Sequence, residues 1–594
     1  MAKKFSNADI SKLLRNVAVA YTLKDEKKHR FQIIAYQNAS EAIAHSTIEL
    51  QDLYRTQNID DFPGIGTSIK KYLEELFTTG TVEHFDTILK NTPQAIFPLL
   101  DVPSFGPKKA AKLVIHFNLS DPKTVLEDVE NLAKNGQIAE LPGFGEKSEK
   151  DILRALSEYK SGTTKSDRMV LPYAYALSQT ILEYMKKCPD ILDVQPLGSL
   201  RRMVSTIGDV DLAATSNNTE AVLEYFTHFP GTERVIERGP TTAAILVSGG
   251  KHIDLLVLPP ESFGSMLQHF TGSKFHNVAL REYSLKKGYS LSERGIKLLK
   301  ENDTLKTFKT EKEFYHFLGL DWIPPEIREN QGEIEAAKNH TLPSLIELSD
   351  IKGDLHIHSS YDLEPSHDMG KNTMQEHLNK AEKLNYSYIG FSEHNPSVMN
   401  HTKQQVLEIM KKRQMYIEQI KESNKSIRVF NLLELDILAD GSLAIDDSAL
   451  EYIDAAIVSV HSSFSMDKKK MTDRIIAGLS HPKAKILAHP TGRLINQRTG
   501  YEVDWERLFE FVKTQNKALE INSWPTRLDL PDMLVKQAKD LGLKFVINTD
   551  SHALDHMDNM FYGVSVARRG WCEAKDILNT YSVKRFESWL IETH

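Results

Sequence analysis

The sequence predicts a multidomain α/β protein, and three observations lead to this prediction. A chain of 594 residues is too long to fold around one hydrophobic core. Apolar residues recur at helical spacing near the N-terminus, and strand-like runs that carry acidic residues follow them. In the second half, short apolar strands alternate with helical segments, as they do in a parallel barrel.

The composition is that of an ordinary soluble protein, with 41% hydrophobic and 26% charged residues. No run of about 18 apolar residues occurs and the N-terminus lacks a secretory signal, so we expect no membrane association. Cysteine is limited to Cys188 and Cys572. This excludes a disulfide framework and a cysteine-based zinc site, and it favours the cytoplasm.

A net charge of −8 argues against a broad basic surface for nucleic acid. Helix N-termini and backbone amides can still bind phosphates without net positive charge.

The N-terminal region is predicted to be helical, with helices over residues 7–23 and 29–41. A Pro-Gly-apolar-Gly turn occurs at residues 63–66 and 142–145, and a copy at 103–106 has Ser104 in place of the first glycine. Each turn exposes the free N–H groups of the next helix to a phosphate. Three such turns resemble helix-hairpin-helix motifs, which hold the DNA backbone independently of sequence. The candidate DNA-binding residues are Gly64, Gly66, Gly106, Lys108, Gly143 and Gly145.

Residues 165–260 read as an α/β or α+β domain, with strands at 193–197, 209–213, 242–247 and 253–258 and helices at 171–186 and 219–229. Asp209 and Asp211 alternate on one strand and therefore share a face. Two such carboxylates are costly without a cation, and oxygen ligands suit Mg²⁺. An Asp-x-Asp alone is more often without function. Here Asp254 supplies a third acid, and Gly198-Ser199-Leu200-Arg201-Arg202 offers amides, a hydroxyl and guanidinium groups to a polyphosphate. This combination is what two-metal nucleotidyl transfer needs.

Residues 1 to about 325 resemble a family X DNA polymerase. The resemblance implies a nucleotidyltransferase palm, a thumb-like α+β subdomain and Mg²⁺ or Mn²⁺ at the polymerase site. It implies that Asp209, Asp211 and Asp254 are the catalytic and metal-binding aspartates. It implies nucleotide contacts at Gly198, Ser199, Arg202, Gly208, Gly272, Asn277 and Arg281.

Two positions depart from the family pattern. Many relatives have Tyr-Phe before the Thr-Gly that precedes Ser273, where this chain has His269-Phe270, so discrimination of the sugar is left open. The Schiff-base lysine of relatives with 5′-deoxyribose-phosphate lyase activity corresponds to Tyr72. We therefore do not predict that lyase.

In the second half, short apolar strands end in histidine or acidic residues. One buried histidine is readily explained as a core residue, but five strand-end clusters are not. The residues concerned are His356, His358, His394, Glu434, His461, His489, Asp550 and His552.

Residues 350–590 resemble the PHP (polymerase and histidinol phosphatase) domain of bacterial family X polymerases. The resemblance implies a distorted (β/α)7 barrel in which those eight residues and a ninth ligand hold up to three metals. The ninth is Asp362 counting forward and Asp368 by its following context, and we favour Asp368 slightly. His and carboxylate ligands without thiolate suit Mn²⁺, Zn²⁺ or Fe²⁺. Arg493 is a candidate for holding the scissile phosphate.

The predicted domains are helix-hairpin-helix regions at 1–90 and 91–162, a palm at 163–260, a nascent-base-pair subdomain at 261–325, a linker at 326–350 and the PHP domain at 351–594. We expect a monomeric, cytoplasmic, nucleoid-associated enzyme that fills gapped or nicked DNA with dNTPs. We expect a 3′–5′ exonuclease in the PHP half, with cleavage at abasic sites as a further activity. Two alternatives are a PHP phosphodiesterase whose front half only binds DNA, and a polymerase whose PHP half is only structural.

Overall fold

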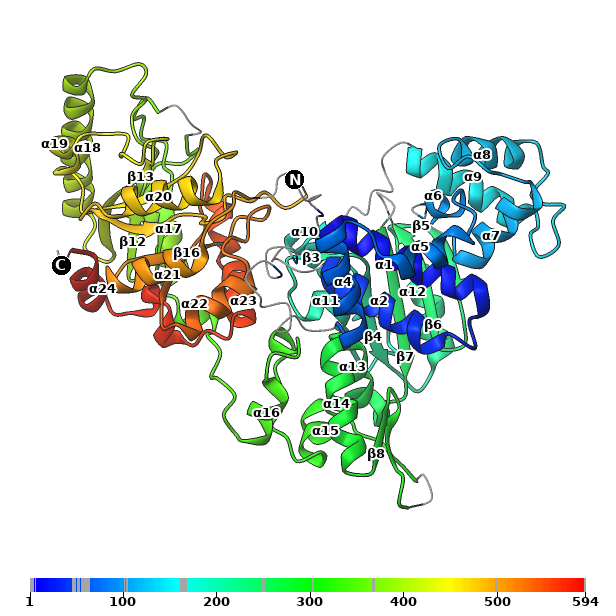
Figure 1. Ribbon diagram of the computed structural model, residues 1–594. Coiled ribbons are helices and arrows are strands. Elements are labelled where there is room, and N and C mark those ends of the chain that lie inside the picture. Colours follow the sequence, from blue (N-terminus) through cyan, green and yellow to red (C-terminus); the bar gives the residue numbers. More distant parts are fainter. Residues whose placement is uncertain are drawn as a thin grey trace. The chain divides into compact units, whose positions relative to one another are not determined.

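The computed structural model describes residues 5, 7–44, 50, 54, 65–100, 102, 105–160, 168–247, 251–301, 304–365, 369–496 and 500–591. The chain divides into two compact units, Met1–Asp167 and Arg168–His594, which are described separately (Figure 1). Among the described residues, no helix has the length and apolar character needed to cross a bilayer.

The first unit is helical and has two hydrophobic cores. One core joins the first four helices below, and the other joins the last four and includes Val19 of α1. The helices are α1 (Asn7–Asp25), α2 (Arg30–Ala44), α4 (Thr67–Thr79), α5 (Glu83–Lys90), α6 (Ile96–Leu99), α7 (Pro107–His116), α8 (Val125–Lys134) and α9 (Glu146–Lys160).

The palm of the second unit is a five-stranded sheet in the order β2-β4-β7-β6-β5, in which β4 and β7 are parallel and the other pairs are antiparallel. Its strands are β2 (Asp193–Pro196), β4 (Val210–Thr215), β5 (Thr232–Arg238), β6 (Thr242–Val247) and β7 (Lys251–Leu258). Around it lie β1 (Met169–Val170), β3 (Thr206–Ile207), α10 (Leu171–Met185), α11 (Gly198–Arg201) and α12 (Thr219–Thr227). The four strands predicted for this domain are present, and β5 was not foreseen.

The α+β subdomain that follows combines helices with the antiparallel sheet β10-β9-β8. Its elements are α13 (Phe263–Thr271), α14 (Lys274–Lys286), β8 (Tyr289–Ser292), β9 (Gly295–Leu298), β10 (Thr304–Lys306), α15 (Glu311–Phe317) and α16 (Glu333–Lys338). The segment 326–350, expected to be a linker, is well packed: Glu333 is fully buried and its Oε1 lies 2.6 Å from His276 Nδ1.

The C-terminal part is a parallel barrel of seven strands in sequential order. They are β11 (Gly353–Ile357), β12 (Tyr388–Phe391), β13 (Arg428–Asp436), β14 (Ala455–Ser459), β15 (Ala484–Leu487), β16 (Ala518–Asn522) and β17 (Lys544–Asn548). A parallel bridge from Ile357 to Ser551 joins the two end strands, so the barrel is nearly closed. Register shifts between β11 and β12 and between β14 and β15 distort it. The predicted distorted (β/α)7 barrel is therefore confirmed.

Strand residues alternate between the inside and the outside of the barrel. On β13, Phe430 and Leu432 belong to an interior cluster, whereas Val429 and Leu433 pack in the outer core. The outer helices, coloured from yellow-green to red in Figure 1, are α17 (Met374–Lys383), α18 (Lys403–Ser423), α19 (Asp447–Leu450), α20 (Lys468–Leu479), α21 (Trp505–Thr514), α22 (Asp532–Asp540) and α23 (Met560–Arg569). The last helix, α24 (Val583–Ile591), adds Phe586 to the interior cluster.

Short 3-10 helices connect several of these elements. They are η2 (Pro260–Ser262), η3 (Pro325–Ile327), η4 (Leu348–Asp350), η5 (Leu554–Asn559), η6 (Ala574–Asp576) and η7 (Leu578–Thr580).

Candidate active sites

Two of the three palm acids face each other across neighbouring strands. Asp211 on β4 is in register with Asp254 on β7, and both residues are half-buried. Asp209 lies one residue before β4 and is exposed. Because register partners on paired strands project from the same face, the sheet brings Asp211 and Asp254 together.

A cavity of about 240 Å³ opens beside this pair, lined also by Glu237 of β5 and Phe270 of α13. Burial, Asp254 and Asp209 together raise the pKa of Asp211 to about 6. Burial and Asp209 also raise the pKa of Asp254. A divalent cation relieves such repulsion, and oxygen ligands suit Mg²⁺ or Mn²⁺. The acids therefore fit a divalent metal.

The turn before β4 approaches these acids closely. Gly198 begins α11 with φ of +58°, and a Cβ atom there would lie 2.6 Å from Asp211 Oδ2. Ser199 is the next residue of the same turn and is half-buried. Only glycine satisfies both the backbone conformation and this approach.

Arg202 is fixed by two contacts from separate segments. Its Nε donates to Glu329 Oε1 at 3.0 Å, and its Nη1 donates to the carbonyl of Thr271 at 2.5 Å. A Cβ atom on Gly272 would lie 3.0 Å from Arg202 Nη1. The structure thus brings Arg202 and Gly272 together, although 70 residues separate them in the sequence.

The candidate base-contacting residues lie on α14. Asn277 donates to the carbonyl of His269 at 2.6 Å and accepts from Gln268 Nε2 at 2.8 Å. Arg281, one turn later, is exposed. Burial and Arg281 lower the pKa of His269. The His269-Phe270 segment therefore lies between α14 and the acidic cavity, since Phe270 lines that cavity.

The predicted DNA-binding turns each precede a helix. Gly66 is the N-cap of α4, Gly106 is the N-cap of α7, and Gly145 directly precedes α9. Gly143 has φ of +85°. Lys108, on the first turn of α7, pairs with Glu26 at 2.6 Å, and both side chains are exposed. Gly64 lies outside the described residues.

Tyr72 occupies the position of the family's lyase lysine, and its ring makes an aromatic contact. Tyr72 stacks on His84, with ring centroids 4.7 Å apart and an interplanar angle of 3°. A ring held in this way offers no amine for a Schiff base.

The barrel gathers the eight predicted ligands at the C-terminal ends of its strands, which is where parallel barrels place their sites. Glu434 continues the inward-facing series of Phe430 and Leu432 on β13. Around its carboxylate lie His394 Nδ1 at 3.0 Å, His489 Nε2 at 3.0 Å, His356 Nε2 at 3.2 Å and His461 Nε2 at 3.4 Å.

Asp550 forms a second centre, with its Oδ1 3.3 Å from His358 Nε2 and 3.6 Å from His356 Nε2. Burial opposes its charge, but His356 and His358 hold the pKa of Asp550 well below its usual range. Burial and His358 lower the pKa of His552 to about 4. His552 is therefore neutral at physiological pH, the form in which histidine binds metals.

Three overlapping groups of these residues could each hold a metal ion, with ligand atoms within 4.8 Å of one another. They are His358, His394 and His552; His356, His358 and Asp550; and His394, Glu434 and His461. Among the predicted ligands, the buried ring nitrogens His358 Nδ1 and His489 Nδ1 have no hydrogen-bond partner in the described part of the chain. Buried unpaired nitrogens are costly, so these residues fit metal ions.

The ninth ligand is not settled among the described residues. Asp362 is exposed and accepts from the backbone N–H of Glu364 at 2.7 Å. It belongs to none of the three metal-capable groups found in the described part of the chain. Asp368 lies outside the described residues.

Two arginines of neighbouring segments, the predicted Arg493 and Arg527, lie in contact with each other, and Arg527 also approaches a predicted metal ligand. Arg493 donates to the carbonyls of Arg527, at 2.8 Å, and of Leu528. Arg527 Nε lies 3.6 Å from Asp550 Oδ2. Both carbonyls belong to the loop that carries Arg527, so this loop holds the guanidinium of Arg493 by hydrogen bonds.

Several supporting residues were missed by sequence reasoning. Asp436 Oδ1 lies 2.7 Å from His461 Nδ1, and Glu520 Oε1 lies 2.7 Å from His356 Nδ1. Such carboxylates orient metal-binding histidines. The signal for Asp436 was its alternation with Glu434 along one strand. Glu520 had a weaker signal, an acid within the apolar run that forms β16.

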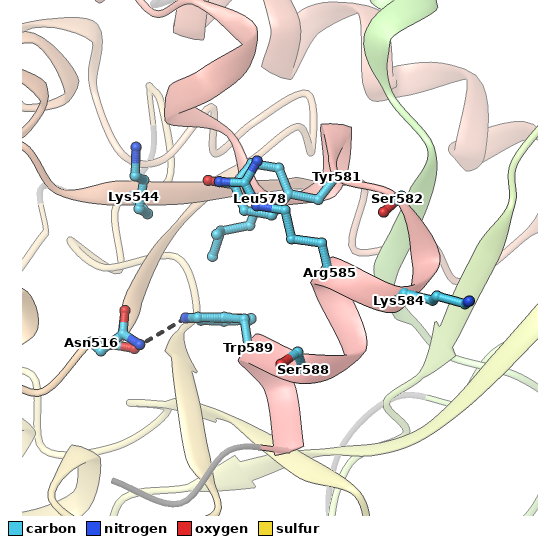
Figure 2. A pocket seen from close by; sticks show the side chains of 9 residues that line it. All are labelled: Asn516, Lys544, Leu578, Tyr581, Ser582, Lys584, Arg585, Ser588 and Trp589. Carbon is cyan, nitrogen blue, oxygen red and sulfur yellow. Dashed lines mark hydrogen bonds between the residues drawn. The ribbon is translucent and has the colours of Figure 1, made fainter.

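A larger pocket of about 630 Å³ lies at the other end of the barrel (Figure 2). It is lined by Asn516, Lys544, Leu578, Tyr581, Ser582, Lys584, Arg585, Ser588 and Trp589. Lys544 begins β17, whereas Asp550 follows its end. None of the predicted site residues lines this pocket.

Comparisons with known proteins match this chain to two family models and to several relatives. A family model described as "DNA polymerase beta thumb" matches residues 266–329, and one described as "Helix-hairpin-helix domain" matches residues 5–82. The DNA polymerase lambda of Arabidopsis thaliana is 23% identical over 360 residues, covering 54% of this chain and 62% of its own. A probable phosphatase of Thermoanaerobacter sp. (strain X514) is 23% identical over 181 residues, covering 29% of this chain and 71% of its own.

A relative from Bacillus subtilis matches nearly the whole chain. The "DNA polymerase/3'-5' exonuclease PolX" of Bacillus subtilis (strain 168) is 33% identical over 584 residues, which cover 98% of this chain and 99% of that protein. The chain therefore belongs to the PolX family of family X DNA polymerases.

Proposed function

We propose that this DNA polymerase and 3′–5′ exonuclease divides its activities between the two clusters described above. We assign nucleotide addition to the palm because Asp211 and Asp254 lie in register on neighbouring strands. The barrel histidines with Glu434 and Asp550 carry the assignment of hydrolysis.

In the palm, Asp209, Asp211 and Asp254 would hold Mg²⁺ or Mn²⁺. When bound, these cations stabilise the attacking and leaving oxygens of phosphoryl transfer. The backbone of Gly198 and Gly208, the Ser199 hydroxyl and the Arg202 guanidinium would bind the triphosphate of a dNTP. Gly198 lets the turn approach Asp211, so the triphosphate would lie beside the acids.

The neighbouring subdomain would bind the nascent base pair. Gln268 and the carbonyl of His269 hold the Asn277 amide in one orientation, and its remaining N–H would contact the base. The exposed Arg281 would reach the template side. Gly272 would bring the backbone close to the nucleotide. The helix-beginning turns at Gly64–Gly66, Gly106–Lys108 and Gly143–Gly145 would hold the DNA backbone.

In the barrel, up to three ions of Mn²⁺, Zn²⁺ or Fe²⁺ would be held by His356, His358, His394, Glu434, His461, His489, Asp550 and His552, with Asp362 or Asp368. When bound, such ions lower the pKa of a water so that hydroxide can attack the phosphodiester. Asp436 and Glu520 orient His461 and His356 for this role. Arg527 would bind the scissile phosphate as a guanidinium fork.

The two sites together suit short-gap filling in repair, with gapped or nicked DNA and dNTPs as substrates and removal of a misplaced 3′ nucleotide. Cleavage at abasic sites would use the same barrel site. We propose a monomeric enzyme associated with the nucleoid, which sedimentation and localisation would test.

A reciprocal pair of variants tests the division of labour. Asp209→Ala should abolish primer extension on a gapped duplex and leave 3′–5′ hydrolysis of a labelled strand intact. His356→Ala with His358→Ala should do the reverse. Loss of both activities in either variant, each shown to be folded by circular dichroism, would overturn the assignment to separate sites.

A further inference from the structure

A buried arginine of the barrel half reaches into the polymerase half. Arg569 ends α23, and its Nη1 donates to the main-chain carbonyl of Arg202 at 2.7 Å. The same nitrogen lies 3.1 Å from Glu329 Oε1, and Arg569 Nε donates to Asp532 Oδ2 at 2.7 Å. The residue is 9% exposed. Burial opposes its charge, but Asp532 and Glu329 hold the pKa of Arg569 above its usual range.

Glu329 connects this arginine to the side chain of Arg202. One oxygen of its carboxylate, Oε1, accepts from Arg202 Nε at 3.0 Å and pairs with Arg569 Nη1. Arg569 therefore holds Arg202 twice, directly through the main chain and through a shared carboxylate. Removing it would leave the half-buried acids Glu329 and Asp532 each without one of their charged partners, which is costly.

The adjacent Arg568 also joins the two halves, but through residues outside the proposed polymerase site. Arg568 donates to Glu326 Oε1, to Glu347 Oε1 and to the carbonyl of Ile346, each at 2.8 Å. It has no contact with the turn at 198–202. Ring contacts of Tyr175 with Phe561 also join α10 to α23. The union of the two halves thus does not depend on Arg569 alone.

We propose that Arg569 is a positioning residue for the polymerase site, which sets the backbone and guanidinium of Arg202 for the incoming triphosphate. The inference rests on the proposed role of Arg202 in triphosphate binding. Its consequence is that affinity for dNTPs depends on a residue of the exonuclease half. A displaced phosphate-binding group weakens the binding of substrate and transition state alike, which raises KM with little change in kcat.

The test compares Arg569→Lys with Arg568→Lys in the full-length protein. Lysine keeps the charge but cannot serve three partners with one fixed fork. Arg569→Lys should raise the KM for dNTP about tenfold with kcat within about threefold. Arg568→Lys should leave both near wild type. The exonuclease rate and the thermal midpoint should be alike in the two variants.

Two further variants separate the possible failures. Glu329→Gln keeps the side-chain shape and should also raise KM, and it replaces Arg569→Lys if that variant does not fold. In Arg202→Lys with Arg569→Lys, KM should rise by less than the product of the two single effects, because the two side chains act on the same phosphate-binding group. If Arg202→Lys leaves KM unchanged, its role in triphosphate binding is wrong. If Arg202→Lys raises KM but Arg569→Lys and Glu329→Gln do not, the positioning role is overturned.

Discussion

Gly198 and Asp211 approach so closely that a Cβ atom on the glycine would lie 2.6 Å from the carboxylate oxygen Oδ2. The glycine also has φ of +58°, a conformation that side chains disfavour. The backbone that would receive the triphosphate thus lies directly beside an acid that we propose as a metal ligand. This close approach requires a residue without a side chain at position 198.

We therefore expect Gly198→Ala to impair nucleotide addition severely. The methyl group must displace either the turn or the Asp211 carboxylate, and an error of about 1 Å at such a site costs roughly 100-fold in rate. Single-turnover primer extension measures this loss, while the exonuclease rate should stay unchanged.

Gly239→Ala, in the turn between β5 and β6, provides the matched control. Its Cβ would meet the Thr242 hydroxyl at 3.1 Å, a group that can rotate away. Equal effects of the two alanines would mean that Gly198 matters only for general stability.

A buried carboxylate links the same turn to the thumb-like subdomain. Glu311 is 5% exposed and accepts from Arg201 Nη2 and Arg328 Nη1, both at 2.7 Å. Burial alone would raise its pKa, but Arg328 and Arg201 lower the pKa of Glu311 to about 2. Its ordinary value is 4.5.

This lowered pKa predicts an acid sensitivity with a defined sign. Glu311 stabilises the native state above pH 4.5, and this stabilisation is lost as the pH falls through about 2. The difference is on the order of 3 kcal/mol. The free energy of unfolding of Glu311→Gln relative to wild type, measured by denaturant titration between pH 7 and pH 3, should show the deficit of the variant shrinking as the pH falls. A deficit that is independent of pH would contradict the charged role of Glu311.

The alternation of residues along single strands carried most of the prediction. Asp211, and the series of strands ending in His, Glu or Asp, pointed to the two candidate sites because spacing and strand ends are local properties, although Asp209 lies one residue before β4. Arg569, Arg527 and Glu237 were missed for the opposite reason. Arg569 meets Arg202 only after folding brings segments 367 residues apart into contact. No periodicity within a short window contains that information.

The loop at 527–529 yields a prediction about substrate binding in the barrel. Arg527 Nε lies 3.6 Å from Asp550 Oδ2, whereas Arg493 is occupied by carbonyls of the loop. Arg527→Ala should lower the exonuclease kcat/KM roughly thirtyfold, because a hydrogen bond to a charged group contributes about 2 kcal/mol. Metal content and the thermal midpoint should change little.

Arg493→Ala should behave differently, with a lowered thermal midpoint that accompanies any loss of activity. If Arg493→Ala loses hydrolysis without losing stability and Arg527→Ala keeps hydrolysis, the residue that binds the scissile phosphate is Arg493.

Glu434 is the acid on which the barrel site depends most directly. Four histidines approach its carboxylate within 3.4 Å. Burial opposes its charge, but His394, His356 and His461 hold the pKa of Glu434 well below its usual range. Glu434→Gln keeps the shape and removes the charge, so it should lose at least one bound metal and the exonuclease activity. Plasma emission spectroscopy of the purified protein gives the metal content, and primer extension with added Mg²⁺ should persist.

Arg585→Gln, a charge change in the pocket at the opposite end of the barrel (Figure 2), should keep both the metals and hydrolysis. Unchanged metal content in Glu434→Gln would contradict its role as a ligand, because a neutral amide in that place cannot balance a divalent ion among histidines.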